Sequence, residues 1–502
     1  MAHTDAMPPG PDLSQGVPLT SVPATGVLAG HVAGAPVLLA RLDDGIFAVS
    51  GACTHYGAPL AEGLVVDGEI RCPWHHACFS LRTGAALKAP AFGALSRWDV
   101  EVVGDNVFVR GESASTATPT ASLDHPARIV IIGGGAAAFA AAERLRSLGY
   151  TGTLTMLSAD DAPPCDRPNL SKDYLAGTAP EDWIPLQGQE FYTERRIDLH
   201  LDCDVAAIDT ASRQVVTQSG ERFDYDALLI ATGAEPVRLP VPGLDGPNVF
   251  TLRSLADARA IIAATAGATS VVLVGAGFIG LEAAGALRTR GLDVHVVARE
   301  ELPMAHILGP ELGEALTDLH RRNGVVFHLR STVAGFDGEH LTLDDGTRIA
   351  ADMVIVGAGV APRTALASAA GLTVDDGILV DSHLQTSLPG IFAAGDVARY
   401  PHGAGTARIE HWVHAQRQGQ AAAASMLGIG QAYDEVPFFW THHYGVDLRV
   451  VGHATHWDQV RIDGQPSGND ATARFYREGR LVAAASLGRD LQNLAIETEL
   501  GP

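Results

Sequence analysis

Residues 127–149 read ARIVIIGGGAAAFAAAERLRSLG. The apolar run RIVII is followed by a glycine turn and by an alanine-rich segment that closes on another glycine. This order is typical of a buried strand, a tight turn and a helix, the unit that binds the pyrophosphate of a dinucleotide in a parallel α/β sheet. Gly133 and Gly135 would let the backbone approach the phosphates at the helix N-terminus, and Ala138 takes the third position of the motif.

The same plan recurs at residues 269–291, which read TSVVLVGAGFIGLEAAGALRTRG. Here the motif consists of Gly275, Gly277 and Gly280, and Gly275 lies 142 residues after Gly133. One glycine motif of this kind is a weak signal, whereas two copies with the same flanking pattern are not expected by chance. Their separation is too large for a solenoid repeat and indicates two nucleotide-binding domains.

The strand that follows the first motif supplies a carboxylate where a nucleotide-binding sheet needs one. It reads GTLTMLSAD and ends at Asp160, 27 residues after Gly133, where a carboxylate can bind the hydroxyls of a ribose. Apolar strands and alanine-rich helical patterns alternate from residue 127 onward, as in a parallel α/β sheet. From about Gln431 this alternation is lost, and runs such as PFFWTHHYG (437–445) predict strands of a further, mixed domain.

Residues 112–126, ESASTATPTASLDHP, predict a linker because they are small, polar and without apolar periodicity. Before this linker, short β-rich runs alternate with Gly and Asp turns. Such alternation is typical of a small antiparallel β domain.

The β region carries two Cys and two His with the spacing of metal ligands. One residue separates Cys53 from His55, sixteen residues separate His55 from Cys72, and His75 follows three positions after Cys72. Zinc accepts such ligands, but zinc fingers usually place both cysteines on one element and both histidines on the next. A Rieske [2Fe–2S] centre binds one iron through two thiolates and the other through two imidazoles. One Cys and one His on each loop favour this second type of centre.

Composition limits the partners and the compartment. With 502 residues, 46% of them apolar and 19% charged, the chain has material for about three packed domains and is not mostly disordered. A formal net charge of −23 disfavours nucleic acid and anionic membranes as partners. Five cysteines, an odd number, favour a reducing compartment, and no targeting segment is visible. The longest nonpolar run, residues 129–142, is shorter than the roughly 20 residues of a membrane span. We therefore expect a cytoplasmic protein.

Residues 18–111 resemble a Rieske ferredoxin domain of the type that serves bacterial oxygenases, in both ligand loops, in Gly57, in the turn RTG (82–84) and in the following LKAPAFG. From residue 127 onward, the chain resembles the FAD-dependent ferredoxin reductases of bacterial dioxygenase and monooxygenase systems and the apoptosis-inducing-factor group. The motifs that carry this second resemblance are DRPNLSKDYL (166–175), LLIATGAEP (228–236), GAGFIGLE (275–282), VGAGVAPRT (356–364), LPGIFAAGDVA (388–398), EHWVHAQRQGQAAAASMLG (410–428) and PFFWTHHYG (437–445). The whole order is similar to that of the apoptosis-inducing-factor-like proteins, which fuse the two parts.

The resemblance implies a multidomain chain, in which a small all-β Rieske domain precedes an α/β two-dinucleotide-binding flavoprotein with an α+β C-terminal domain. The expected divisions are a flexible tail 1–17, the Rieske domain 18–111, the linker 112–126, an FAD-binding domain 127–249 and 369–430, an NAD(P)H-binding domain 250–368 and a C-terminal reductase domain 431–502.

The resemblance also implies residue roles. Lys172 would pair with Glu282 near the flavin N5, each offsetting the cost of burying the other, and Trp412 would lie against the flavin or the nicotinamide. These three form the expected catalytic group. The other cofactor-binding residues expected, besides Asp160 and the two glycine motifs, are Arg167, Pro168, Thr232, Gly233, Asp396 and Gly359.

Three departures from the family pattern stand out. Cys165 replaces an aromatic residue before Asp-Arg-Pro, and Asn169 replaces the second proline. The strand LDVHVVARE ends with Ala298 and Arg299, where the family has a glutamate for the 2′-hydroxyl of NAD. Arg299 would suit the 2′-phosphate of NADPH, whereas the two glutamates that follow oppose it, so both nicotinamide cofactors stay open.

The expected function is that of an NAD(P)H-dependent flavoprotein ferredoxin reductase. Electrons would pass from the nicotinamide through FAD to the chain's own Rieske cluster and on to an unidentified acceptor, such as an oxygenase, a cytochrome or a small molecule. We expect a monomer or a homodimer. The alternatives are a redox sensor with a long-lived reduced state and an NAD(P)H oxidase.

Overall fold

The computed structural model describes residues 9–113 and 125–501. These residues form two compact units, of which the first contains residues 9–113 and Asp490–Gly501 and the second contains residues 125–489. Each unit has apolar clusters of its own and is described by itself.

The first unit is a β structure of two antiparallel sheets with the strand orders β1-β10-β9-β4-β3-β2 and β5-β6-β7-β8. Its strands are β1 (Val17–Pro18), β2 (Val27–Val32), β3 (Ala35–Leu42), β4 (Gly45–Ser50), β5 (Leu64–Val66), β6 (Glu69–Arg71), β7 (Cys78–Ser80), β8 (Ala86–Lys88), β9 (Arg97–Val103) and β10 (Asn106–Glu112). Leu38 and Val49 of the larger sheet and Ile70 and Phe79 of the smaller one belong to the same buried cluster. The two predicted ligand loops follow β4 and β6, so a common core anchors both.

The last helix of the chain, α9 (Asp490–Leu500), also belongs to this first unit. It packs against β5, and an oxygen of Glu497 lies 2.7 Å from Nδ1 of His76. Both side chains are buried. The expected domain 431–502 therefore differs from the observed compact units at its final helix, because α9 makes its contacts with strands that lie more than 400 residues earlier in the chain.

The second unit begins with the parallel sheet expected after residue 127, in the order β13-β12-β11-β17-β29. Its strands and helices are β11 (Arg128–Ile132), α1 (Ala136–Ser147), β12 (Thr153–Leu157), α3 (Gln189–Glu194), β13 (Asp198–His200), β17 (Ala227–Ile230), β29 (Ile391–Ala393) and α8 (Trp412–Met426). The small sheets beside it contain β14 (Val205–Asp209), β15 (Gln214–Thr217), β16 (Arg222–Asp224), β28 (Ile378–Leu379), β30 (Ala398–His402) and β31 (Gly405–Ala407). Because β29 returns to pair with β17, this domain consists of two separate parts of the chain.

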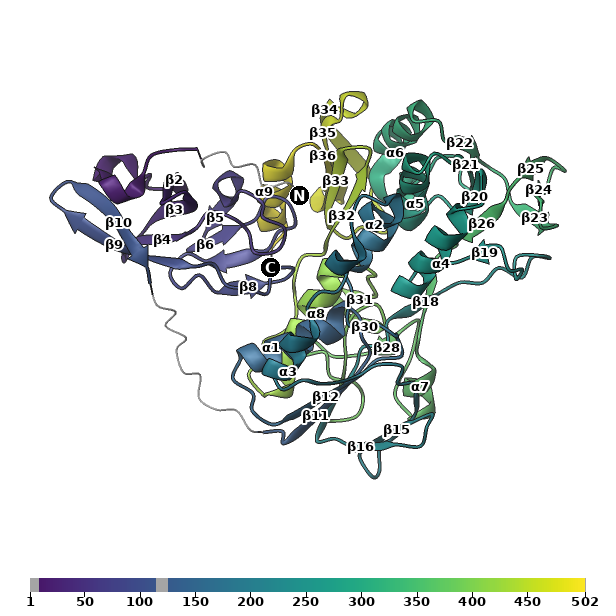
Figure 1. Cartoon of the computed structure of the whole chain (residues 1–502), viewed down its shortest axis with the longest axis horizontal. Coiled ribbons are helices and arrows are strands. Elements are labelled where there is room, and N and C mark those ends of the chain that lie inside the picture. The colour runs from purple at the N-terminus through teal and green to yellow at the C-terminus, as the bar shows by residue number, and fades with distance from the viewer. Residues whose placement is uncertain (1–8, 114–124, 502) are drawn as a thin grey trace. The chain divides into compact units, whose positions relative to one another are not determined.

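Helices α1 and α8 lie side by side (Figure 1). A Cβ atom on Gly419 of α8 would lie 2.2 Å from the carbonyl oxygen of Ala137 in α1, so this approach requires glycine. Helix α1 begins at the first glycine turn, and α8 begins at Trp412. The close contact therefore fixes the relative position of these two predicted site elements.

The inserted domain forms a second parallel sheet with the order β19-β26-β20-β21-β22. Its elements are β19 (Val249–Phe250), α4 (Leu255–Thr265), β20 (Ser270–Val274), α5 (Phe278–Thr289), β21 (Asp293–Val297), α6 (Ala305–Arg322), β22 (Val326–His328), β23 (Val333–Phe336), β24 (His340–Leu343), β25 (Arg348–Ala350) and β26 (Met353–Val356). The antiparallel strands β18 (Ala234–Pro236) and β27 (Val360–Pro362) connect this domain to the first sheet, and α7 (Ala365–Ala369) follows.

The C-terminal part of the second unit is a five-stranded antiparallel sheet, β32-β33-β36-β35-β34. Its strands are β32 (Phe438–His443), β33 (Val446–Gly452), β34 (Gln459–Gln465), β35 (Asp470–Arg477) and β36 (Arg480–Leu487). Strand β32 contacts α5 of the inserted domain and α8 of the first. The expected order of a β domain, an α/β reductase and a C-terminal domain is confirmed.

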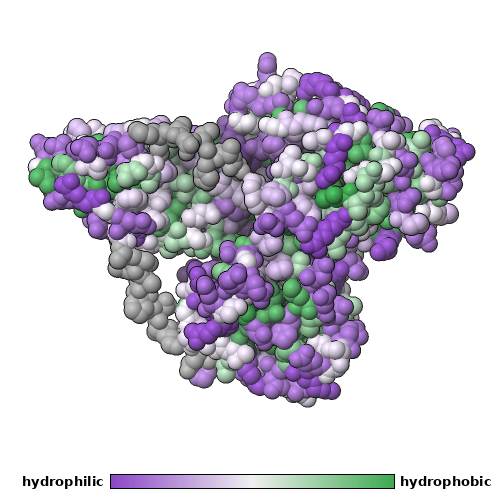
Figure 2. Space-filling view, viewed as in Figure 1, coloured by the Kyte–Doolittle hydropathy of each residue, from purple (hydrophilic) through white to green (hydrophobic). Residues whose placement is uncertain are grey.

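The surface shown in Figure 2 is mostly hydrophilic, with apolar residues in separate patches. The exposed apolar side chains include Val102 and Val103 on β9, Trp183 and Ile429. No helix of the described residues is long and apolar enough to cross a membrane. The five cysteines are all free thiols.

Candidate functional site

A cavity of about 910 Å³ in the second unit brings together most of the predicted cofactor contacts. The predicted residues that line it are Gly133, Gly135, Asp160, Arg167, Pro168, Lys172, Thr232, Gly233, Glu282, Asp396 and Trp412. They come from six separate stretches of the sequence. The volume of the cavity is near the upper end of the range of roughly 300–1,000 Å³ found for ligand pockets. Ala138 does not line it, because its side chain is buried inside α1.

The first glycine turn has the geometry that a pyrophosphate requires. Gly133 has a φ of 130°, and a Cβ there would lie 2.2 Å from the carbonyl oxygen of Ala231. Gly135 is the N-cap of α1, and no side chain caps this helix. Its first N–H groups are therefore available to an anion at the cavity wall. These features fit the phosphates of FAD.

Two ion pairs lie in the same cavity. Arg167 contacts Asp160 at 3.0 Å, next to the first turn. Arg253 contacts Asp396 at 2.6 Å, with Asp396 almost fully buried. The sequence reasoning named Asp396 but missed Arg253, which precedes α4 and lines the cavity. The Thr232 hydroxyl donates a hydrogen bond to the carbonyl oxygen of Arg363 at 3.0 Å, next to the paired strands β18 and β27.

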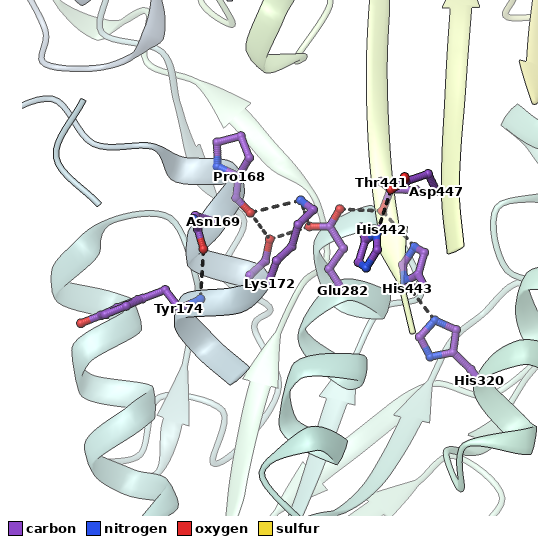
Figure 3. A network of polar contacts seen from close by, with 11 residues as sticks. Pro168, Asn169, Lys172, Tyr174, Glu282, His320, Thr441, His442, His443 and Asp447 are labelled. Carbon is purple, nitrogen blue, oxygen red and sulfur yellow. Dashed lines mark hydrogen bonds and ion pairs between the residues drawn. The ribbon is translucent and has the colours of Figure 1, made fainter. Parts of the chain in front are cut away.

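The expected pair of Lys172 and Glu282 is present, with Nζ 2.8 Å from Oε2 (Figure 3). The two side chains are only 14% and 5% exposed. Lys172 also donates to the carbonyl of Pro168 at 3.1 Å, and Ser171 donates its hydroxyl to Glu282 at 2.5 Å. A fixed ammonium group thus lies in the cavity wall, and burial of the carboxylate is offset by several donors.

Aromatic side chains form another part of the wall. Trp412 is joined there by Phe278, Phe439, Trp440 and His411. The ring centroids of His411 and Phe439 are 4.1 Å apart in a stacked arrangement, and those of Phe278 and Phe439 are 4.5 Å apart. The Nζ atom of Lys172 lies 6.0 Å from the centroid of the Trp440 ring. The sequence reasoning missed these four residues, although each lies inside one of the quoted motifs.

The second glycine turn begins α5 in the inserted domain. Gly275 has a φ of 114°, and a Cβ on Gly280 would lie 2.4 Å from the carbonyl oxygen of Gly275. A Cβ on Gly277 would meet no protein atom within 4 Å, so the turn has open space at its middle glycine. No side chain caps the helix that follows. This turn fits a second dinucleotide.

Besides Ala138 and the second glycine motif, two further predicted contacts lie outside the large cavity. Arg299 is exposed just after β21, and the nearby Glu301 forms an ion pair with Arg330. Gly359 is exposed between β26 and β27, where its carbonyl accepts the N–H of Val237.

In the first unit, the two predicted ligand loops have the same backbone pattern. Cys53 N–H donates to Ala58 and the Cys53 carbonyl accepts from Gly57, while Cys72 N–H donates to Ala77 and the Cys72 carbonyl accepts from His76. Gly57 and His76 take the corresponding left-handed positions, with φ of 74° and 59°. The two loops are therefore equivalent turns, each of which presents one thiol and one imidazole.

The four side chains meet as a thiol pair and an imidazole pair. The Cys72 thiol hydrogen-bonds to Cys53, which lowers the pKa of Cys53 and raises that of Cys72. The Nδ1 atoms of His55 and His75 are 3.2 Å apart, close to the roughly 3.4 Å expected for two nitrogens about 2.1 Å from one tetrahedral metal ion. Across residues 9–113 and 125–501, no three His, Cys, Asp or Glu side chains converge on one metal ion. Two pairs suit the two irons of a Rieske cluster.

Comparisons with known proteins agree with this arrangement. Family models match as a Rieske [2Fe-2S] domain at residues 18–99, a pyridine nucleotide-disulphide oxidoreductase at 127–419 and a reductase C-terminal domain at 438–498. Human apoptosis-inducing factor 3 is 33% identical over 476 residues, which cover 90% of this chain and 78% of the relative. Rhodocoxin reductase of Rhodococcus erythropolis is 36% identical, with 73% of this chain and 88% of the relative covered.

Among solved structures, the covalent complex of putidaredoxin reductase with putidaredoxin matches with a TM-score of 0.72 and 31% identity, covering 75% of this chain and 93% of that one. The chain therefore belongs to the pyridine nucleotide-disulphide oxidoreductase family and carries a Rieske domain before the reductase. It is an NAD(P)H-dependent flavoprotein reductase of the ferredoxin reductase type, with FAD and a [2Fe–2S] cluster as cofactors. Electrons pass from the nicotinamide through FAD to an external acceptor.

Proposed function

We propose that each chain is a self-contained electron-transfer system, in which the reductase reduces the Rieske domain of its own chain. The observation that carries this proposal is that one chain contains both a Rieske domain at residues 18–99 and a reductase whose first glycine turn, Asp160 and Lys172–Glu282 pair converge on one cavity. The chemistry that FAD supplies when bound is hydride uptake from a nicotinamide and release of single electrons to an iron–sulfur centre.

In this proposal, the chain's residues bind and orient the two nucleotides. The N–H groups at the start of α1 would bind the FAD pyrophosphate, and Asp160 would accept the ribose hydroxyls. Pro168 and Gly233 would border the flavin, and Lys172 would hold negative charge on the ring by electrostatic attraction.

The aromatic wall would exclude water from the reacting edge of the flavin. Trp412 and Trp440 line the cavity from two different elements, α8 and β32. Their rings offer flat apolar surfaces on which the flavin or the nicotinamide can stack. We propose Trp412, together with Lys172 and Glu282, as the groups that contact the reacting rings.

The nicotinamide nucleotide would bind at the second turn, through Gly275, Gly277 and Gly280, with Gly359 close to it. We propose Arg299 as the residue that meets the adenosine ribose or its 2′-phosphate. Glu301 is already paired with Arg330, which reduces the repulsion that it would exert on a phosphate. The proposal therefore admits NADPH as well as NADH.

The fused arrangement replaces a diffusional encounter. The covalent linker raises the effective concentration of the Rieske domain at its reductase, without any new contact. Putidaredoxin reductase has been solved in a covalent complex with putidaredoxin, and we propose that the fused Rieske domain is the electron acceptor of the reductase here. An oxygenase is the external acceptor that we propose, with a cytochrome or a small molecule as alternatives, in a cytoplasmic monomer or homodimer.

An anaerobic titration tests the proposal. NADH and, separately, NADPH are added to the complete protein, and flavin bleaching is followed together with the electron paramagnetic resonance signal of the reduced cluster. We expect the cluster signal to rise with the first equivalents of nucleotide. The rate constant of its appearance should not depend on protein concentration. A cluster that stays oxidised beside reduced flavin would contradict transfer within the chain.

Cys72→Ala is the matched control. It removes one iron ligand and should abolish the cluster signal, while NAD(P)H still reduces an artificial dye through the flavin. Loss of dye reduction with FAD still bound would show that the flavin does not receive the electrons first.

A further inference from the structure

The Lys172–Glu282 pair continues into a buried chain of three further side chains (Figure 3). Thr441 Oγ1 lies 2.5 Å from Glu282 Oε1 and 2.9 Å from His443 Nε2. His443 Nδ1 lies 3.2 Å from Nε2 of His320. Thr441 and His443 share one face of β32 because side chains alternate along a strand, and His320 comes from α6.

The position of every proton in this chain follows from its first member. An ionised carboxylate can only accept, so Thr441 must donate its single hydroxyl proton to Glu282. The hydroxyl oxygen then accepts from His443, whose proton is on Nε2. Nδ1 of a neutral His443 is an acceptor, so His320 must donate to it from its own Nε2.

The far end of the chain agrees with this assignment. The assignment leaves Nδ1 of His320 without a proton, and this buried atom has no hydrogen-bond partner among the described residues. The reverse assignment would leave a buried, unpaired N–H there and would place a hydroxyl lone pair against the carboxylate, both of which are costly. The rings of Tyr444 and Phe327 lie edge-on to His320 at centroid distances of 5.1 and 6.2 Å.

Both imidazoles are held neutral. Burial lowers the pKa of His443 to about 3, and the nearby charge of Lys172 acts in the same direction. Burial also lowers the pKa of His320 well below its usual range. Of the other titratable groups that face His443, His442 lowers its pKa and Asp447 raises it, and both are smaller effects than burial. A neutral imidazole has one N–H donor and one acceptor nitrogen, so His443 can donate one hydrogen bond to Thr441 and accept one from His320.

We propose that Thr441, His443 and His320 form a directed hydrogen-bond chain that points one hydroxyl proton at Glu282 and thereby fixes the ion pair beside the flavin. His443 and His320 are positioning residues in this chain, since neither contacts the cofactor cavity. The inference rests on the proposed role of the Lys172–Glu282 pair. It adds that the hydrogen-bond chain sets how much positive charge the Lys172–Glu282 pair presents to the flavin ring.

The first test reads the protons themselves. In the FAD-loaded protein with labelled histidine, nitrogen NMR distinguishes the two neutral tautomers of each imidazole, and His443→Gln and His320→Gln assign the signals. We expect the Nε2–H tautomer for both residues, without titration between about pH 5.5 and 8. The Nδ1–H tautomer at either residue, or a titration in that range, would overturn the proposal. The NMR measurement needs no electron transfer, so it tests the tautomers even if reduction within the chain does not occur.

The second test separates orientation from packing. His443→Gln keeps an N–H donor for Thr441, whereas His443→Leu removes it from a side chain of similar size. Without the donor, the Thr441 hydroxyl can turn away, and Glu282 then draws the Lys172 ammonium more closely, leaving less positive charge for the ring. One hydrogen bond to a charged group changes an equilibrium constant by about tenfold.

We expect His443→Leu to lower the two-electron potential of the flavin by the equivalent of that factor, about 30 mV, and His443→Gln to shift it less than twofold in equilibrium constant. Thr441→Val and Thr441→Ser form a second pair with the same expectation, in case the Leu variant does not fold. Equal potentials within both pairs, or equal shifts in all four variants, would overturn the proposal.

Discussion

Replacing Gly419 by alanine tests whether the close contact of α1 with α8 holds the first nucleotide turn in place. The new Cβ would lie 2.2 Å from the carbonyl oxygen of Ala137 and 2.9 Å from its carbonyl carbon, where real Cβ atoms stay beyond 3.0 Å. The helices must therefore separate by at least about 0.8 Å. Both obstructing atoms are backbone atoms, so no side chain can rotate away to make room.

The cost follows from two opposing effects. Overpacking of a closely packed contact costs about 1–3 kcal/mol. Alanine favours the helix by about 1 kcal/mol over glycine, which offsets part of this cost. A net loss of up to about 2 kcal/mol remains, and where this loss falls on the FAD-bound form it weakens FAD binding by up to about 30-fold.

The assay is FAD affinity by fluorescence, together with the thermal unfolding of the FAD-loaded protein. Gly285→Ala is the matched control, since the nearest side chain to its Cβ in α5 would be Tyr444 at 3.6 Å, an ordinary contact. That variant should bind FAD normally and gain up to about 1 kcal/mol. If Gly419→Ala bound FAD as tightly as Gly285→Ala, the contact between the two helices would not position the turn.

Three further predictions concern charges. Lys172→Met should lower the free energy of unfolding by about 3 kcal/mol, because it leaves the buried Glu282 carboxylate without its cation. The double variant Lys172→Met/Glu282→Gln should lose less. Equal urea midpoints for the single and the double variant would contradict this. Arg299→Ala should raise KM about tenfold for NADPH and less than twofold for NADH, and equal effects in steady-state kinetics would remove Arg299 from the 2′ site. Burial raises the pKa of Glu143 to about 7 from an ordinary 4.5, so its contribution to stability is complete below about pH 4.5 and is lost as the pH rises through 7. Glu143→Gln should therefore stabilise the protein by about 3 kcal/mol at pH 8 and by less than about 1 kcal/mol at pH 5, as measured by thermal unfolding at both values.

The features that could be predicted from the sequence are local ones. Both Cys/His loops are closed by backbone hydrogen bonds between residues four or five positions apart, and each glycine motif occupies six consecutive residues, so their spacing is written directly in the chain. The order of the domains followed from the same motifs and is confirmed. The individual cofactor contacts, Lys172 among them, stay predictions until ligands are bound.

The features that could not be predicted depend on contacts between distant segments. Arg253 meets Asp396 from 143 residues away, and Thr441 meets Glu282 from 159. Arg253 has no neighbour in sequence that marks it as part of a site, and although Thr441 lies in the motif PFFWTHHYG (437–445), nothing in that motif points to Glu282. Their roles arise only when β32, α5 and the loop before α4 pack around one cavity.

Taken by itself, the sequence determined the two nucleotide folds, the type of metal centre and the Lys172–Glu282 pairing, because each depends on residue types at fixed short spacings or in a recognisable motif. The tertiary structure alone decided that α9 joins the first unit through His76 and Glu497, which are 421 residues apart. It also decided that two histidines extend the ion pair. The physical reason is that a buried polar group must find a partner wherever packing supplies one, and packing joins segments irrespective of their distance along the chain.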